Sequence, residues 1–121
     1  MARSFARNEL HPMAPEHDQS GVYPLETLQK AWEIRLGDTH VPEHCGSLGL
    51  GGLDGCILAE ETAWGGTGSS TAIEVNILAA STLIVAGSKS QQRRCLDLLT
   101  EEFTLAAHGV TEPGSGPDAI S

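Results

Sequence analysis

The residues best suited to chemistry lie near the end of the chain, in the run Val-Thr-Glu-Pro-Gly-Ser-Gly-Pro-Asp from Val110 to Asp118. Pro113 fixes its own φ and the glycines on either side of Ser115 permit positive φ, so a tight turn is predicted. Such a turn can bring backbone N–H groups close to an anion or a flat polar ring, and Thr111 adds a hydroxyl that donates and accepts. The plain alternative is the exit turn of a strand. Neither a Walker loop nor a dinucleotide fingerprint is present, because no Gly-Lys-Ser/Thr and no helix follows.

Glu74 is the second candidate, since Thr71-x-x-Glu74 matches a capping box at the start of a helix that runs to Ala86. An acid in the first turn also interacts favourably with the helix dipole, so a structural role would suffice for this residue. The helix is apolar almost all round, which predicts a central, buried helix of a bundle. The residues that make it so are Val75, Ile77, Leu78, Leu83, Ile84 and Val85.

His40, His44 and Cys45 lie close together in a Gly-rich loop and could form half of a metal site. The alternative is that these polar groups bond to the loop backbone. No second ligand pair with zinc spacing occurs in the sequence, so no metal is predicted. The three cysteines, which include Cys56 and Cys95, have no paired spacing and indicate free thiols in a reducing compartment.

The remaining pattern predicts short helices around these candidates. An N-terminal helix is ended or kinked by Pro12 and Pro15, and residues 17–21 read as a polar connector. Further helices are predicted from Pro24 to a stop at Gly37, from Asp54 to Trp64, and from a capping box at Ser88 and Gln91 through Leu99. The run Phe103–Ala107 reads as a short strand that leads into the turn. The fold class predicted is an all-α helical bundle that ends in the first strand of a truncated β domain.

Composition limits the kind of partner. The chain has 121 residues, 40% of them apolar, and a net charge of −9. This length fits one domain or part of one, and the acidic balance argues against nucleic acid or an anionic membrane surface as partner. No signal peptide is expected, and no run is expected to span a membrane.

Several spaced motifs resemble the acyl-CoA dehydrogenases, and the medium-chain members in particular. Residues 110–116 resemble the flavin-binding signature V-T-E-P-G-A-G-S-D of that family. The motifs upstream that agree in order are Tyr23-Pro24, Ala31-Trp32-Glu33, Thr39-His40-Val41-Pro42-Glu43, Gly49-Leu50-Gly51 and Thr71-Ala72-Ile73-Glu74. The resemblance implies an N-terminal helical domain over residues 1–102, without the family's extreme N-terminus. It implies the first strand and flavin-binding turn of a truncated middle β domain over residues 103–121.

The resemblance also implies roles for individual residues. The residues expected to contact FAD are His108, Gly109, Val110, Thr111, Glu112, Pro113, Gly114, Ser115, Gly116 and Pro117. Two of these positions differ from the family, which has an aromatic residue at 108 and a serine at 117. Four residues are expected to line the acyl pocket, with Glu74 at its floor and Val75 and Leu78 on its wall; the fourth is Pro117. Docking of electron-transferring flavoprotein falls on Ile34, Leu36, Leu48, Leu50 and Leu58. The plain alternative for Ile34, Leu36 and Leu58 is core packing.

The family removes a proton and a hydride from neighbouring carbons of a fatty acyl-CoA thioester, in fatty acid β-oxidation. The resemblance therefore implies an FAD-dependent oxidoreductase fragment, a homotetramer in the complete enzyme, and a mitochondrial matrix location. No Glu or Asp in this sequence matches the catalytic base, and no transit peptide is visible. We therefore expect the isolated chain to be inactive, and cytosolic if it is expressed as it stands. The alternative is a non-catalytic helical module that docks on full-length subunits or on electron-transferring flavoprotein.

Overall fold

A computed structural model describes residues 1–116 of the chain as a bundle of short helices around one long helical hairpin. The helices are α1 (Ala2–Phe5), α2 (Ala14–Ser20), α3 (Leu25–Glu33), α4 (Gly52–Gly65), α5 (Thr67–Ala86) and α6 (Lys89–Glu101). A π-helical turn, η1 (Ala6–Leu10), continues α1, and a 3₁₀ turn, η2 (Glu43–Cys45), lies in the loop before α4. The all-α bundle predicted from the sequence is confirmed.

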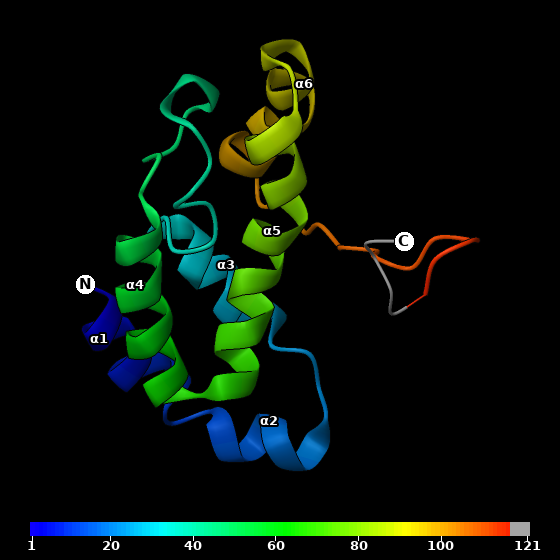
Figure 1. Cartoon of the computed structure of the whole chain (residues 1–121). Helices are drawn as coiled ribbons and strands as arrows, with labels where there is room; N and C mark the ends of the chain where they lie inside the picture. Colours follow the sequence, from blue (N-terminus) through cyan, green and yellow to red (C-terminus); the bar gives the residue numbers. More distant parts are fainter. Residues whose placement is uncertain (117–121) are drawn as a thin grey trace.

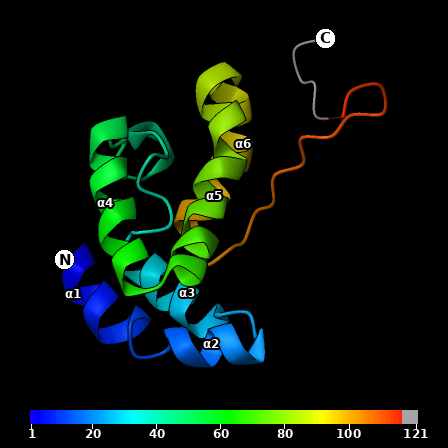
Figure 2. The same cartoon turned by 60° about the horizontal axis from the view of Figure 1, so that its bottom comes forward.

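Helices α4 and α5 stand side by side and antiparallel, because the single residue Gly66 joins them (Figure 1). Helix α1 packs on α4, and α3 and α6 pack on α5. Helix α2 crosses the end of the hairpin where α5 begins, and the C-terminal segment leaves the bundle beside α5 (Figure 2). The hairpin is therefore the element against which all the others are placed.

Two apolar clusters hold the bundle, and α5 contributes to both. The first cluster contains Ala2, Phe5, Ala6, Leu10, Leu28, Ala31, Leu36 and Ile73. The second contains Val41, Cys45, Ala80, Leu96 and Leu99. Ile73 and Ala80 are two turns apart on α5, so this helix connects the two clusters.

The prediction that α5 would be the most buried helix was wrong. Five of its 20 residues are buried, compared with four of 13 in α6. Ile77 and Leu83 are only partly buried, while Leu78 and Val85 expose 52% and 86% of their surface. The reason is that α5 has packing partners on one side only within residues 1–116.

Helix α5 is also long and apolar enough to cross a membrane by length and composition, contrary to the sequence-based expectation, and only 28% of its apolar window is buried. Core helices of soluble proteins pass the same test.

Several predicted helix ends need correction. Helix α5 begins at Thr67, one turn before the predicted Thr71–Glu74 capping box, and the Thr71 hydroxyl donates to the Thr67 carbonyl instead. Residues 17–20 are helical rather than a connector, because Pro15 occupies the first turn of α2, where proline is tolerated. Helix α3 ends at Glu33 instead of reaching Gly37, since Arg35 takes a positive φ of 62°.

The capping box of α6 is confirmed. The Gln91 amide donates to Ser88 Oγ at 3.4 Å, and the Ser88 amide donates to Gln91 Oε1 at 2.8 Å.

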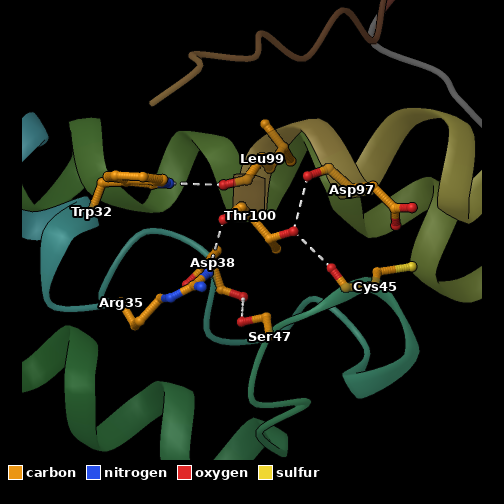
Figure 3. Close-up of polar contacts among 8 residues, drawn as sticks. All are labelled: Trp32, Arg35, Asp38, Cys45, Ser47, Asp97, Leu99 and Thr100. Atoms are coloured by element: carbon orange, nitrogen blue, oxygen red, sulfur yellow. Dashed lines mark hydrogen bonds and ion pairs between the residues drawn. The ribbon is translucent and has the colours of Figure 1, made fainter. Parts of the chain in front are cut away.

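The C-terminal end of α6 is fastened to the rest of the bundle by polar contacts (Figure 3). Trp32 Nε1 donates to the Leu99 carbonyl at 2.9 Å, and Arg35 Nη1 donates to the Thr100 carbonyl at 3.2 Å. The Thr100 hydroxyl in turn donates to the Cys45 carbonyl at 2.7 Å. The last carbonyls of a helix lack intrahelical partners, and these contacts satisfy two of them. The direction in which the chain leaves α6 is thereby fixed.

The predicted strand Phe103–Ala107 does not form a strand in the described part of the chain. Within residues 1–116 the segment is extended and pairs with no other strand, and the only β-type pairing there is an isolated bridge between Glu112 and Ser115. A strand needs a partner for its backbone groups, and residues 1–116 provide no second strand. The backbone of this segment bonds to a side chain of α5 instead.

Candidate functional site

A hollow on the outer face of α5 brings together three of the residues predicted to bind substrate. Its volume is about 370 Å³, and its lining consists of Thr71, Glu74, Val75, Ile77, Leu78 and Ser81. Residues three and four apart share one face of a helix, which explains why Glu74 and Leu78 lie together. We call this hollow the α5 groove. Its walls are mainly aliphatic, and this suits an apolar chain.

The hydroxyl groups of the α5 groove are already occupied. Thr71 Oγ1 donates to the Thr67 carbonyl at 2.9 Å, and Ser81 Oγ donates to the Leu78 carbonyl at 2.6 Å. The Glu74 carboxylate is half-buried and has no hydrogen bond to any described residue. Glu74 is therefore the polar group of the groove that remains available to a ligand.

Burial raises the pKa of Glu74 above its ordinary value, and the charge of His40 opposes this shift more weakly. The His40 ring is held in place by its Nδ1, which lies 2.8 Å from the Leu50 carbonyl. The ring also lies so close to Gly55 of α4 that a Cβ there would come within 2.3 Å of His40 Nε2. The loop before α4 thus holds the imidazole ring of His40 near the Glu74 carboxyl.

We expect Glu74→Gln to be more stable than the wild type at pH 7. A carboxyl whose pKa is raised on folding contributes stability that is fully present below its unfolded value of 4.5 and is lost as the pH rises through the folded value. Glutamine avoids this loss because it carries no charge. Urea unfolding of both proteins should show a difference at pH 7 that closes at about pH 3.5, a unit below the ordinary carboxyl value. The exposed Glu33→Gln is the matched control, and a pH-independent difference for Glu74→Gln would contradict the prediction.

The predicted flavin-contacting residues form an exposed segment that ends in a closed turn. The Glu112 amide donates to the Ser115 carbonyl at 2.9 Å, and the Ser115 amide donates to the Glu112 carbonyl at 3.1 Å. The predicted turn is therefore present, although Gly114 and Gly116 do not use positive φ. Residues 109–114 are exposed, and Pro117 lies outside the described residues. The structure does not bring this turn to the α5 groove, since the segment runs away from the bundle (Figures 1 and 2).

Of the five predicted docking residues, one is buried, three are partly buried and one is exposed. Leu36 is buried in the first core cluster, and Ile34 and Leu58 pack partly buried against it. Leu50 is half-buried, whereas Leu48 exposes 49% of its surface. Ile34 borders a hollow of about 270 Å³, whose other lining residues are Met1, Ser4, Phe5, Asn8 and Glu9.

The predicted ligand candidates of the loop before α4 bond to protein groups. His40 bonds to the Leu50 carbonyl, and His44 Nε2 lies 2.9 Å from Gln92 Oε1. Burial raises the pKa of the Cys45 thiol, and Asp97 adds to this shift. All three cysteines are free, as predicted. Within residues 1–116, no three potential metal ligands are brought together.

Sequence reasoning missed Asn76, which faces the extended segment from α5. Its side chain bonds to the backbone of residues 104 and 106. The available signal was one amide residue in an otherwise apolar stretch of helix, at a position that the helical period places on the inner face with Ile73 and Ala80.

The chain is similar to known proteins over its whole length. The family model described as acyl-CoA dehydrogenase, N-terminal domain, matches residues 1–102. A relative from Caenorhabditis briggsae, named probable medium-chain specific acyl-CoA dehydrogenase 2, mitochondrial, is 32% identical over 117 residues. That match covers 97% of this chain and 29% of the relative, so the chain spans less than a third of the length of that relative.

Two solved structures show the same arrangement of helices. One is described as the electron transferring flavoprotein of Acidaminococcus fermentans, with a TM-score of 0.85 and 27% identity over 98% of this chain and 31% of that chain. The other is a probable acyl CoA dehydrogenase from Mycobacterium abscessus, with a TM-score of 0.81 and 30% identity over 98% of this chain and 32% of that chain.

Proposed function

Because the chain belongs to the acyl-CoA dehydrogenase family, whose N-terminal domain it contains, we propose that it is part of an FAD-dependent enzyme that oxidises medium-chain fatty acyl-CoA thioesters between the α and β carbons. The observation that carries this proposal is the α5 groove, which gathers Glu74, Val75 and Leu78 in one aliphatic hollow. The relative named as medium-chain specific supports the substrate class.

In this proposal the groove forms one wall of the acyl pocket. Val75, Ile77 and Leu78 bury the methylene groups of the acyl chain, each worth about 0.8 kcal/mol. Glu74 closes the pocket, because placing an apolar chain end against a polar carboxyl is unfavourable.

We propose that residues 108–116 hold the flavin ring and its linker, with Pro117 completing the set. Their exposure fits this role, since the extended backbone and the Thr111 hydroxyl are open to a flat polar ring. FAD, when bound, supplies the acceptor for the hydride that leaves the β carbon. In this proposal the residues of the chain bind and orient the substrate and the flavin, because no Glu or Asp of the sequence matches the family's catalytic base.

The partners and location are part of the same proposal. Electron-transferring flavoprotein would dock through Ile34, Leu48, Leu50 and Leu58, of which Leu48 offers the most exposed surface. Leu36 contributes through the core behind them. The complete enzyme would be a homotetramer in the mitochondrial matrix, a location supported by the name of the relative from Caenorhabditis briggsae. We also propose a domain boundary between residues 102 and 103, a position supported by the end of α6 at Glu101.

We propose that the 121-residue chain does not turn over substrate by itself, since the α5 groove has walls from one helix only. The second candidate function is an interaction module that docks on full-length subunits. The bare aliphatic surface at Leu78 and Val85 favours it, because large exposed apolar patches mark contact sites.

The acyl-binding role predicts that octanoyl-CoA perturbs the backbone NMR signals of residues 71–81, whereas free CoA does not. Leu78→Asp should abolish the perturbation, because it places a charge in the α5 groove. Val85→Asp, on the same helix but outside the groove, should leave it intact. Equal shifts with free CoA, or equal loss in both variants, would remove the α5 groove as an acyl site and leave the interaction module as the better reading.

A further inference from the structure

We propose that Asn76 is a positioning residue that fixes the register of residues 103–107 against α5, and thereby sets where the turn at Glu112–Ser115 stands relative to the α5 groove. The proposal rests on the proposed roles of the turn and the α5 groove. The contact between Asn76 and the segment is an additional feature, since neither role by itself requires it.

Asn76 acts on the extended segment as a neighbouring strand would. Its Nδ2 donates to the Thr104 carbonyl at 3.0 Å, and the Ala106 amide donates to its Oδ1 at 2.8 Å. In an extended chain, the carbonyl of one residue and the amide two residues later point to the same side. A carboxamide offers a donor and an acceptor together, so one side chain can satisfy both groups. The Thr104 carbonyl must face the amide nitrogen of Asn76 and the Ala106 amide must face its oxygen, so the orientation of the side-chain amide is determined.

The contact is buried and specific for this register. Asn76 exposes only 8% of its surface. Phe103 packs edge-on against Trp32, with ring centroids 6.3 Å apart, and Ala106 packs against the second core cluster. Because alternate residues of an extended segment face opposite sides, the nearest equivalent register is two residues away. Such a slip would move the turn by about 7 Å along the segment.

This contact is the last hydrogen bond between the bundle and the segment before the turn. Residues 107–111 form no hydrogen bond with the helices in the described part of the chain. Asn76 belongs to the same helix as Glu74, Val75 and Leu78, but it lies on the inner face. One rigid helix therefore carries the groove on one side and holds the segment on the other. In this proposal the distance between the α5 groove and the turn therefore depends on how the segment is held against α5.

Asn76→Asp tests the contact with little change of shape. The aspartate keeps an acceptor for the Ala106 amide but turns an acceptor toward the Thr104 carbonyl. We expect exchange of the Ala106 amide to accelerate by roughly three- to tenfold, because the segment opens more often once the bond to the Thr104 carbonyl, of ordinary net strength, is lost. Residual dipolar couplings of residues 103–107 should also cease to fit the orientation of α5. Amides of α6, such as Leu96, should keep their protection, which distinguishes positioning from general stability. Asn8→Asp, at an exposed asparagine, is the matched control.

A second pair of variants keeps the test decisive if Asn76→Asp fails to fold. Ala106→Pro removes the donor on the segment, whereas Leu105→Pro brings the same ring constraint but removes an amide that bonds to no described residue. We expect the first, and not the second, to release the Asn76 side-chain amide to solvent exchange. Unchanged couplings in Asn76→Asp, or equal effects of the two prolines, would overturn the proposal. A parallel titration with FAD, read at the amides of residues 108–116, tests the flavin role alone, because its outcome does not alter the exchange result.

Discussion

Replacing Leu10 by alanine is expected to lower the free energy of unfolding by about 2–5 kcal/mol, the range for leucine truncation in a packed core. Leu10 exposes 1% of its surface and belongs to the first core cluster. It lies beneath the joint between α4 and α5, since a Cβ at Gly66 would stand 4.0 Å from Leu10 Cβ. The rigid backbone of this joint limits how far the cavity can collapse. Domains of this size are stable by only about 5–15 kcal/mol, so the change is large.

Urea unfolding followed by circular dichroism measures this effect. Leu25→Ala is the matched control, because Leu25 starts α3 with 51% of its surface exposed and should lose well under 1 kcal/mol by comparison with surface substitutions in general. Loss of a cooperative transition in Leu10→Ala would satisfy the prediction. Similar losses in both variants would show that the first cluster is not packed as described.

The helical segments were predictable where their signals are local. The capping box of α6 depends on two side chains three residues apart, and both of its hydrogen bonds form. The predicted start of α5 was wrong because Thr71 and Glu74 match the capping-box pattern although they lie inside the helix, one turn after its start. There the Thr71 hydroxyl bonds back to the carbonyl four residues earlier, a choice that the pattern cannot distinguish from a cap.

The burial of α5 shows where the sequence pattern stops being informative. An apolar surface all round a helix indicates that every side suits a covering partner, but not which partner covers it. Within residues 1–116 only the side with Ile73 and Ala80 is covered, and Leu78 and Val85 remain exposed.

The candidate site likewise has a part that the sequence predicts and a part that it does not. Helical spacing was enough to place Glu74 and Leu78 on one face, and the α5 groove follows from it. The pairing of Asn76 with the segment joins residues 28 and 30 positions apart. No local period encodes such a contact, because it depends on how α6 returns the chain to α5. The same holds for His40, whose position near Glu74 depends on the small size of Gly55.

The close approach of η1 to α4 gives the last prediction. A Cβ on Gly65 would stand 2.7 Å from the Ala6 carbonyl oxygen and 2.9 Å from Ala6 Cβ. Backbone atoms cannot swing aside as a side chain would, so Gly65→Ala must separate η1 from the end of α4. We expect a loss of about 1–3 kcal/mol, the usual cost of overpacking. Gly68→Ala is the matched control, because Gly68 lies in the first turn of α5 with no atom within 4 Å of its added Cβ. It should gain about 0.5–1 kcal/mol, since alanine loses less conformational freedom in a helix than glycine. Urea unfolding of the two variants should therefore give shifts of opposite sign. A gain in both would mean that η1 does not press on the end of α4 as described.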